Sequence, residues 1–230
     1  MSDSFTGMGP QARREGRANF HRQQSKRSRV EGEEIAAIEA LLGEQAPPAG
    51  SNPLSLEPDP ARPTFASARR FEDMPLSQAT KDALREAKFT TMTAIQRATL
   101  PHALAGRDVL GAAKTGSGKT LAFLVPLVEK LYRARWGRLD GLGGLVVSPT
   151  RELAMQIFDE LQRVGRRHEL SAGLLIGGKD VKEEQSRVNG EQRFLQCAVC
   201  GMPGSLVSFL FFWLLPVLKP APCPTPRSQA

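Results

Sequence analysis

Hydrophobic positions along the chain first follow a helical period in residues 33–42, which read EEIAAIEALL. Four apolar side chains fall on one face of this predicted helix: Ile35, Ile38, Leu41 and Leu42. Residues 46–63 hold too many Pro, Gly and Ser residues for a helix or a strand, so they are predicted to be a linker. Three outcomes stay open for the helix: docking on the next domain, docking on a partner, or poor order.

Residues 71–189 alternate between helical and strand patterns. The predicted helices are 76–87 with Ser77 as its cap, 93–105 ending near Gly106, 118–134 with a kink at Pro126, and one after PTRELA (149–154); the predicted strands are 108–113, 144–148 and 171–177. This alternation predicts a parallel sheet covered on both faces by helices. Ligands bind at the carboxyl ends of such strands, where the sequences GSGK, SPTRE and IGGKD all lie.

Residues 190–230 show neither helical nor strand periodicity. Within them, residues 194–218 carry no charge and are long enough to span a bilayer between Arg193 and Lys219. Prolines and glycines interrupt this stretch, so we expect no stable membrane association and keep a membrane anchor as the alternative. The three cysteines also lie here, and the lone Cys-x-x-Cys pair supplies only two of the four ligands that zinc needs.

The basic charge of the chain is concentrated near its start. The formal net charge is +7. Residues 1–30 hold only Asp3 and Glu15 as acidic side chains against Arg13, Arg14, Arg17, Arg22, Lys26, Arg27 and Arg29. Such an arm indicates either phosphate-rich partners or a solvated, disordered tail. It has no apolar secretory segment, so we read the protein as intracellular. Three histidines are isolated in the sequence and are given no role: His21, His102 and His168.

The sequence AKTGSGKT lies between a predicted strand and a predicted helix. A glycine-rich turn in that position directs several backbone N–H groups at one point, and the helix N-terminus adds partial positive charge. Lys119 would reach the β- and γ-phosphates of a nucleotide, and the Thr120 hydroxyl would bind Mg²⁺. The predicted nucleotide site consists of Ala113, Lys114, Thr115, Gly116, Ser117, Gly118, Lys119 and Thr120.

These motifs resemble those of the DEAD-box RNA helicases. AKTGSGKT is similar to the first motif of that family, and KFTTMTAIQ (88–96) resembles its Q motif, with Thr93 where proline is usual. The resemblance implies ATP as the ligand, because the Gln96 carboxamide can both donate to and accept from the edge of adenine. It places Phe89 at the aromatic position of the Q motif. It also implies that Phe71 stacks on the base.

Two further motifs imply contact with RNA. PTRELA is similar to motif Ia of the family, and the glycine pair at 177–178 matches its GG element. The resemblance implies that these residues bind the sugar-phosphate backbone, independently of base sequence but with preference for RNA over DNA. The implied RNA contacts are Pro149, Thr150, Arg151, Glu152, Gly177 and Gly178.

The predicted fold is therefore α/β, a partial RecA-like P-loop domain over residues 71–189. A basic, Pro-rich and largely disordered arm (1–70) precedes it, and a hydrophobic, Pro-rich tail (190–230) that is not family sequence follows. Several stretches are similar to nucleolar DEAD-box helicases of small-subunit ribosomal RNA maturation, which implies a nucleolar location and pre-ribosomal RNA as the partner. The sequence gives no indication of an oligomeric state.

The family's D-E-A-D and S-A-T motifs and its second RecA-like domain do not occur in these residues. The resemblance implies that hydrolysis and unwinding need those parts. We therefore expect this chain alone to be inactive, either as a piece of an RNA helicase or as a truncation that binds ATP or RNA without turnover. A retained intron after Asn189 would explain the change in composition, and a downstream exon encoding a TPGR-like motif would support that hypothesis.

Overall fold

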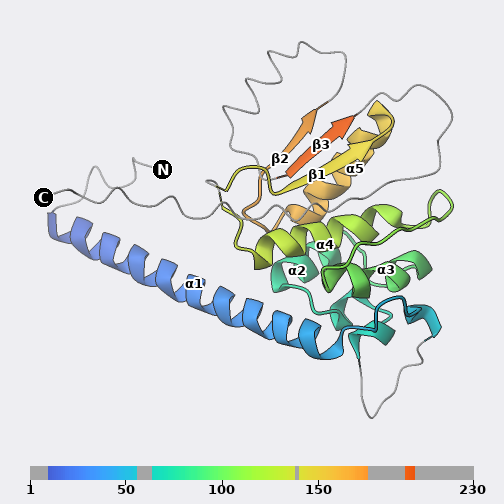
Figure 1. The fold of residues 1–230 in the computed structure, drawn as a ribbon. Coiled ribbons are helices and arrows are strands. Elements are labelled where there is room, and N and C mark those ends of the chain that lie inside the picture. Colours follow the sequence, from blue (N-terminus) through green and yellow to red (C-terminus); the bar gives the residue numbers. More distant parts are fainter. Residues whose placement is uncertain (1–9, 56–63, 138–139, 176–194, 200–230) are drawn as a thin grey trace, which may run out of the picture.

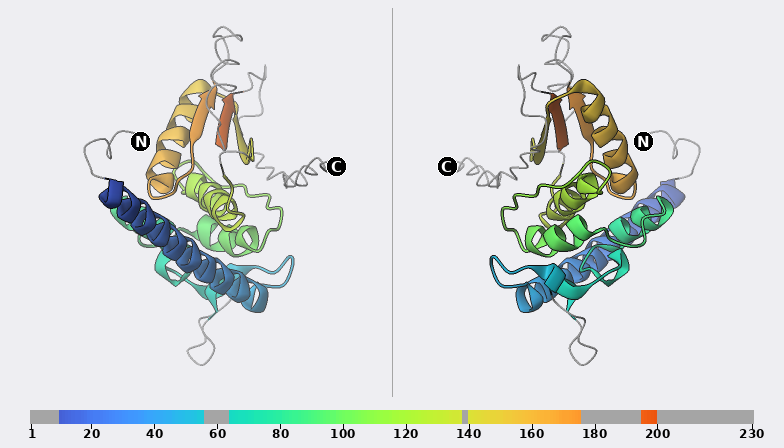
Figure 2. Two further views of the ribbon diagram at one scale, coloured as in Figure 1. Left: turned by 90° about the vertical axis from the view of Figure 1, so that its left-hand side faces the viewer. Right: turned by 90° about the vertical axis from the view of Figure 1, so that its right-hand side faces the viewer.

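The computed structural model describes residues 10–55, 64–137, 140–175 and 195–199. Its helices and strands follow one another as α1 (Pro10–Gln45), the short 3₁₀ turns η1 (Pro53–Ser55), η2 (Phe65–Ser67) and η3 (Phe71–Asp73), then α2 (Gln78–Glu86), α3 (Ala94–Leu104), α4 (Lys119–Arg133), β1 (Gly144–Ser148), α5 (Arg151–Gly165), β2 (Ala172–Leu175) and β3 (Leu195–Val199). Figures 1 and 2 show the sheet and α5 on one side of α4, and α1 on the other.

The helices begin and end close to the predicted positions. Ser77 caps α2, because its side chain accepts a hydrogen bond from the Thr80 N–H at 3.3 Å. Helix α4 is buried on nearly every side from Leu121 to Glu129 and continues through Pro126. A helix buried all round forms the centre of a core rather than its surface. Helix α4 is thus the central element of the described domain, and it starts directly after the glycine loop.

The sheet has three parallel strands in the order β1-β3-β2. Helix α5 packs on one face. Along β1, buried Val146 alternates with the exposed side chains of Leu145 and Val147, so the described helices leave the other face of this strand open. Within the described residues, helices therefore cover one face of the sheet, whereas the prediction had helices on both. Helix α4 packs mainly against α3 and α5.

Two strand predictions are corrected. Residues 108–113 form no strand, and Leu110 within them is 73% exposed. No described strand lies beside this segment, so its backbone groups have no ladder to join. Conversely, β3 lies in the tail, where no regular element was predicted. A central parallel strand is held by pairing along both edges and needs no alternating side chains, so periodicity gives no signal for it.

Helix α1 is much longer than the predicted 33–42 segment, and it docks on the domain. Good helix formers continue N-terminally from residue 33, and Pro10 stands at the first position of the helix, where its missing N–H costs nothing. Ile35, Ile38 and Leu42 are buried, whereas Leu41 is 41% exposed, so only three of the four predicted contacts are made. Of the three outcomes left open for this helix, the structure shows docking on the following domain.

Glu34 fastens α1 to two other helices. One of its carboxylate oxygens accepts from the Gln78 N–H at 2.6 Å, in the first turn of α2. The other accepts from the Tyr132 hydroxyl at 2.5 Å, near the end of α4. A carboxylate at a helix N-terminus is favoured by both the free N–H groups and the helix dipole. The acidic end of α1 is thereby held at a defined place on the domain.

A buried carboxylate joins α4 to the same end of α2. The Glu129 side chain is 0% exposed. It accepts from the Ser77 N–H at 3.1 Å and from the Ser77 hydroxyl at 2.6 Å. Burial raises the pKa of this carboxyl, and the hydrogen bonds from Ser77 oppose that rise. Glu129 is absent from the residues predicted from the sequence, although an acidic residue within the apolar run LAFLVPLVEKL is a visible signal.

His168, which had no assigned role, lies beside this network. Its Nε2 is 2.8 Å from the Thr80 hydroxyl, and its ring meets Tyr132 edge-on with centroids 5.3 Å apart. Burial lowers the pKa of His168 to about 4, although the charge of Glu34 opposes this change. The folded domain therefore holds this imidazole neutral.

This lowered pKa predicts a loss of stability in acid. The unfolded chain binds a proton on His168 below pH 6.5 and the folded chain only below about 4, so stability present above pH 6.5 is lost progressively as the pH falls towards 4. Between pH 7.5 and 5 we expect this group to remove about 2 kcal/mol from the free energy of unfolding. Urea unfolding of wild type and His168→Gln at both pH values measures it, because their difference should shrink by that amount in acid. An equal pH dependence in both proteins would contradict it.

Candidate nucleotide-binding site

The glycine loop ends at the N-terminus of α4 in a left-handed conformation. Gly116 has φ +73° and Gly118 has φ +86°, a region that only glycine enters without strain. A Cβ on Gly118 would also lie 2.6 Å from Nε2 of Gln96 and 3.1 Å from the Thr93 hydroxyl. A Cβ on Gly116 would meet nothing within 4 Å. Gly118 is thus required by both conformation and space, and Gly116 by conformation alone.

Lys119 and Ser117 carry polar groups that fit a phosphate. The Lys119 ammonium donates to the Lys114 carbonyl at 2.8 Å and also to the Ala113 carbonyl, so it lies across its own loop. The Ser117 hydroxyl oxygen is buried and has no hydrogen-bond partner. Buried polar groups are nearly always paired, and an unpaired one needs an explanation. Phosphate oxygens would satisfy the hydroxyl and offer the ammonium a stronger partner than a carbonyl.

Thr120, the predicted Mg²⁺ ligand, is half-buried in the first turn of α4. Among the described side chains there is no group of three or more His, Cys, Asp or Glu residues that could hold a metal. Magnesium is commonly held by one or two protein oxygens together with substrate phosphates and water. A threonine hydroxyl beside the glycine loop fits that arrangement. In the Cys-x-x-Cys pair, Cys200 lies outside the described residues.

Gln96 is tied to the glycine loop. The side chain is 2% exposed. Its Oε1 accepts from the Thr93 N–H at 2.8 Å, and its Nε2 donates to the Gly118 carbonyl at 2.9 Å. Both ends of the carboxamide therefore make hydrogen bonds within the protein, whereas the sequence predicted only a contact with the edge of adenine. The contact with Gly118 joins residues 22 positions apart, and no local sequence pattern indicates it.

The two aromatic residues of the predicted site lie close to the Q motif but differ in exposure. Residues 69–71 and 90–92 run side by side, since the Phe71 N–H donates to the Thr90 carbonyl at 3.2 Å. Phe89 is half-buried against the core, and Phe71 is 2% exposed within it. Stacking of Phe71 on a base stays a prediction, and it requires the ring to leave this core.

The predicted RNA-contact residues follow β1 and are exposed. Pro149, Thr150, Arg151 and Glu152 all lie at the surface, after the buried end of the strand at Ser148. Thr150 caps α5, because its hydroxyl accepts from the Leu153 N–H at 3.3 Å. The N-terminus of α5 therefore presents free N–H groups and the Arg151 guanidinium to one region. Gly177 and Gly178 lie outside the described residues.

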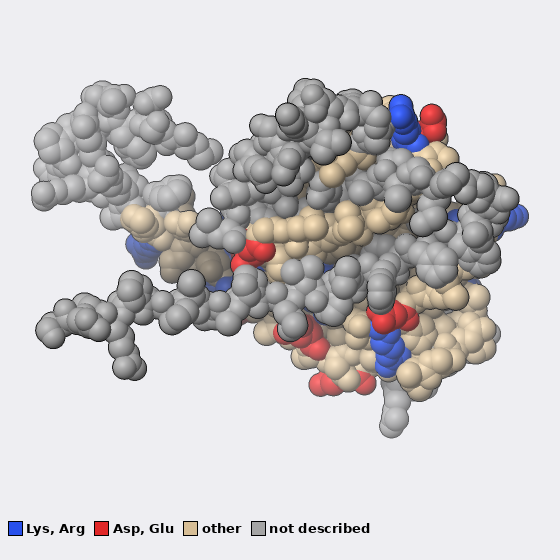
Figure 3. Space-filling view, turned by 45° about the horizontal axis from the view of Figure 1, so that its top comes forward, with Lys and Arg blue, Asp and Glu red and all other residues tan. Residues whose placement is uncertain are grey.

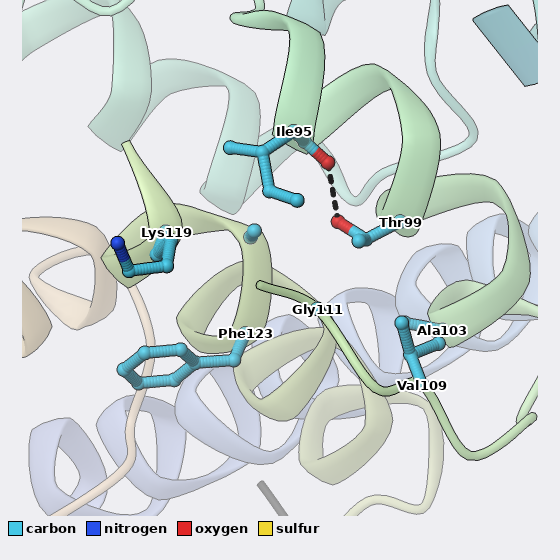
Figure 4. Close-up of a pocket in the computed structure, with 8 residues that line it drawn as sticks. Ile95, Thr99, Ala103, Val109, Gly111, Lys119 and Phe123 are labelled. Atoms are coloured by element: carbon cyan, nitrogen blue, oxygen red, sulfur yellow. Dashed lines mark hydrogen bonds between the residues drawn. The ribbon is translucent and has the colours of Figure 1, made fainter. Parts of the chain in front are cut away.

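A small apolar cavity lies behind the loop, between α3, α4 and residues 109–111 (Figure 4). Its volume is about 50 Å³, far below the several hundred Å³ of a ligand pocket. It is lined by Ile95, Thr99, Ala103, Val109, Gly111, Lys119, Ala122 and Phe123. The cavity thus leaves room for small packing changes behind Lys119, and it does not hold a nucleotide.

The described helices include none with an apolar stretch long enough to cross a bilayer. Most of the alternative anchor, residues 200–218, lies outside the described residues.

A family model and the most similar relatives all point to one family of helicases. A family model described as DEAD/DEAH box helicase matches residues 93–219, which extends past the predicted boundary at 189. The probable ATP-dependent RNA helicase ddx10 of Dictyostelium discoideum is 49% identical over 175 residues, covering 68% of this chain and 20% of the relative. The ATP-dependent RNA helicase dbp4 of Schizosaccharomyces pombe is 56% identical over 140 residues, covering 61% and 18%. The chain therefore spans about a fifth of the length of these curated relatives.

Solved structures agree with the sequence matches. A DEAD box protein from the hyperthermophile Methanococcus jannaschii superposes with a TM-score of 0.50 at 28% identity, covering 59% of this chain and 35% of that one. The DEAD-box helicase Mss116, bound to single-stranded RNA and UDP-BeF, superposes with a TM-score of 0.51 at 27% identity, covering 56% and 27%. These likenesses confirm that the described domain is part of a RecA-like fold. A non-family origin for residues 190–230 stays a prediction.

Proposed function

Because the chain belongs to the DEAD/DEAH box helicase family, we propose that it is the ATP- and RNA-contacting part of an ATP-dependent RNA helicase. ATP with Mg²⁺ is the proposed ligand of residues 113–120. The backbone of RNA is the proposed ligand of residues 149–152 and of the glycine pair at 177–178. Residues 113–120 and residues 149–152 each lead into the N-terminus of a helix, α4 or α5, and helix N-termini attract phosphate groups.

The unpaired Ser117 hydroxyl is the observation that carries the nucleotide proposal. It lies in the same short loop as the Lys119 ammonium and the start of α4, so a donor, a cation and a helix dipole share one place. An anion with several acceptor oxygens satisfies all three together. When bound, Mg²⁺ would offset the charge of the phosphates, with Thr120 as its protein oxygen.

Adenine rather than guanine is the proposed base because of Gln96. Its carboxamide holds Gly118 and Thr93 in the described conformation. The carboxamide has two N–H donors and two acceptor positions, so capacity beyond these two bonds is available for the N6 and N7 edge of adenine. We therefore propose that Gln96 contacts the base while it keeps the phosphate loop in place.

We further propose that the RNA is pre-ribosomal and that the protein acts in the nucleolus. Pre-ribosomal RNA and the nucleolus are proposed because AKTGSGKT, PTRELA and the segments around them resemble nucleolar helicases, and the identity of 49% to ddx10 and 56% to dbp4 supports both. Residues 1–230 contain no D-E-A-D or S-A-T sequence. We therefore propose that residues 1–230 alone bind ATP and RNA with negligible turnover. Hydrolysis of ATP by residues 1–230 would indicate a working piece of such a helicase, and binding without hydrolysis would indicate a binding-only truncation.

Binding measurements on the purified 230-residue chain test this function. With a fluorescent ATP analogue and Mg²⁺, we expect saturable binding that ATP reverses at least about tenfold more effectively than GTP, because a base edge left unpaired costs one or more kcal/mol. Labelled single-stranded RNA should bind more tightly than DNA of the same sequence, and Arg151→Ala should weaken that binding. Absence of ATP binding would overturn the nucleotide site, and RNA-stimulated phosphate release would overturn the binding-only assignment.

A further inference from the structure

Charge is divided sharply along α1. Between residues 10 and 30 the helix carries seven Arg and Lys residues and a single acidic residue, Glu15. From residue 31 onwards it carries acidic side chains and the apolar residues that dock on the domain. At 1.5 Å per residue the basic part is about 30 Å long. The helix thus consists of a basic half, residues 10–30, and a shorter docked acidic half, residues 31–45.

The docked half fixes the direction in which the basic half extends. Glu34 holds α1 to α2 and α4, and Ile35 and Ile38 are buried on the domain. Two further contacts follow towards the basic half: the Arg135 guanidinium donates to the Ser28 carbonyl at 3.4 Å, and Arg27 pairs with Glu169 at 2.8 Å. Figure 1 shows the N-terminal half of α1 running past the edge of the domain.

The described basic side chains of this half are open to solvent. Every residue from 21 to 30 is exposed. Arg22, Lys26 and Arg29 follow at spacings of four and three, so they share one face of the helix. Within the described chain, Arg22 and Lys26 meet no carboxylate, and Arg29 has only an exposed partner, Glu33, at 3.5 Å. Exposed pairs of that kind are weak and are readily replaced by a phosphate.

This face lies far from the predicted RNA and nucleotide sites. Tyr132, where α1 touches α4, is 13 residues from Lys119, which separates the contact from the glycine loop by about 20 Å. In Figure 1 the N-terminal ends of α4 and α5 lie on the opposite side of the domain from the basic end of α1. On the face drawn in Figure 3, the described Lys and Arg side chains are scattered rather than gathered. The basic half of α1 is therefore a separate surface.

We propose that Arg22, Lys26 and Arg29 form a second RNA-binding surface, which holds the backbone of a stretch of RNA outside the segment bound at residues 149–152. Its ligand is single-stranded RNA, matched to a row of cations by charge and independent of base sequence. This inference rests on the proposed RNA-binding function and adds a second contact to it. The rigid attachment of α1 gives that contact a fixed position relative to the domain.

Salt-dependent RNA binding by the 230-residue chain tests the surface. With oligo(U) of about 40 nucleotides as the ligand, replacing three cations that bind phosphate makes the negative slope of log K against log salt concentration shallower by about 2. We expect this change, with affinity reduced about tenfold or more, in the triple variant Arg22→Gln, Lys26→Gln, Arg29→Gln. The matched control Arg69→Gln, Arg85→Gln, Arg163→Gln removes the same charge from exposed positions off α1, and its slope should stay near the wild-type value.

Four further measurements keep the outcomes distinct. Lys26→Glu alone should make the negative slope shallower by about one or more, and circular dichroism checks the helix in each variant. Equal slopes for wild type and the triple variant would overturn the proposed RNA-binding surface. If the triple variant kept the wild-type slope but lost binding to vesicles containing phosphatidylserine, the ligand of this surface would be a membrane and not RNA. Fluorescent ATP binding should be the same in all variants. Its absence in the wild type would instead mark a failure of the proposed function.

Discussion

Replacing Lys119 by alanine is expected to weaken ATP binding about tenfold to hundredfold, since a hydrogen bond to a charged group contributes about 1.5–3 kcal/mol. The Lys119 ammonium lies on the carbonyls of Ala113 and Lys114, which are neutral and weaker partners than a phosphate. Binding of a triphosphate would exchange these contacts for charge-assisted ones. Titration of the fluorescent ATP analogue in the presence of Mg²⁺ measures the loss.

Lys114→Ala is the matched control for that variant. Lys114 contributes to the proposed site through its backbone, because its side chain is exposed and only its carbonyl receives the Lys119 ammonium. Removal of this side chain should change ATP affinity less than about threefold, as for a solvated charge. If both variants lost affinity equally, the net charge of the loop and not the position of Lys119 would explain binding.

Replacing Glu129 by alanine is expected to lower the free energy of unfolding by about 3 kcal/mol or more. The change would leave the buried Ser77 N–H without an acceptor and would leave a cavity where the Glu129 side chain had been. Each of these effects costs one to several kcal/mol. Burial of the carboxylate itself costs free energy, as the raised pKa of Glu129 indicates, and the alanine variant avoids this cost. The net destabilisation is therefore smaller than the sum of the two losses. Urea denaturation followed by circular dichroism measures the result.

Glu129→Gln separates the hydrogen bonds from the charge. Glutamine keeps the size of the side chain and one acceptor oxygen, so about 1 kcal/mol of destabilisation is expected from the acceptor that becomes a donor. A glutamine variant as unstable as the alanine variant would mean that the negative charge itself holds the start of α2. An alanine variant as stable as wild type would contradict the role of Glu129 altogether.

The helices of this domain could be predicted because each carries local signals. Ser77 and Thr150 cap α2 and α5, and apolar residues repeat at the helical period behind them. The length of α1 was missed because its polar N-terminal half has no apolar period, although it has few helix-breaking residues. Docking of that helix was one of three outcomes, because an apolar face shows that contact is favourable without showing the partner.

The strands were harder to predict because pairing is a long-range property. The apolar run at 108–113 has the composition of a strand but no described neighbour, whereas β3 pairs on both edges without a visible pattern. The site shows the same division. The glycine conformations follow from the loop sequence, but the burial of Phe71 and the bond from Gln96 to Gly118 depend on packing between distant segments.

The attachment of α1 changes where the folding unit begins. The motifs start at residue 71, yet the core also includes Ile38, Leu42 and Phe65, and the start of α2 receives a carboxylate from Glu34. A polypeptide cut at 71 would expose the apolar surface that α1 covers and would leave the Gln78 N–H without that acceptor. The packed unit therefore begins before Glu34, and the basic half of α1 extends from it.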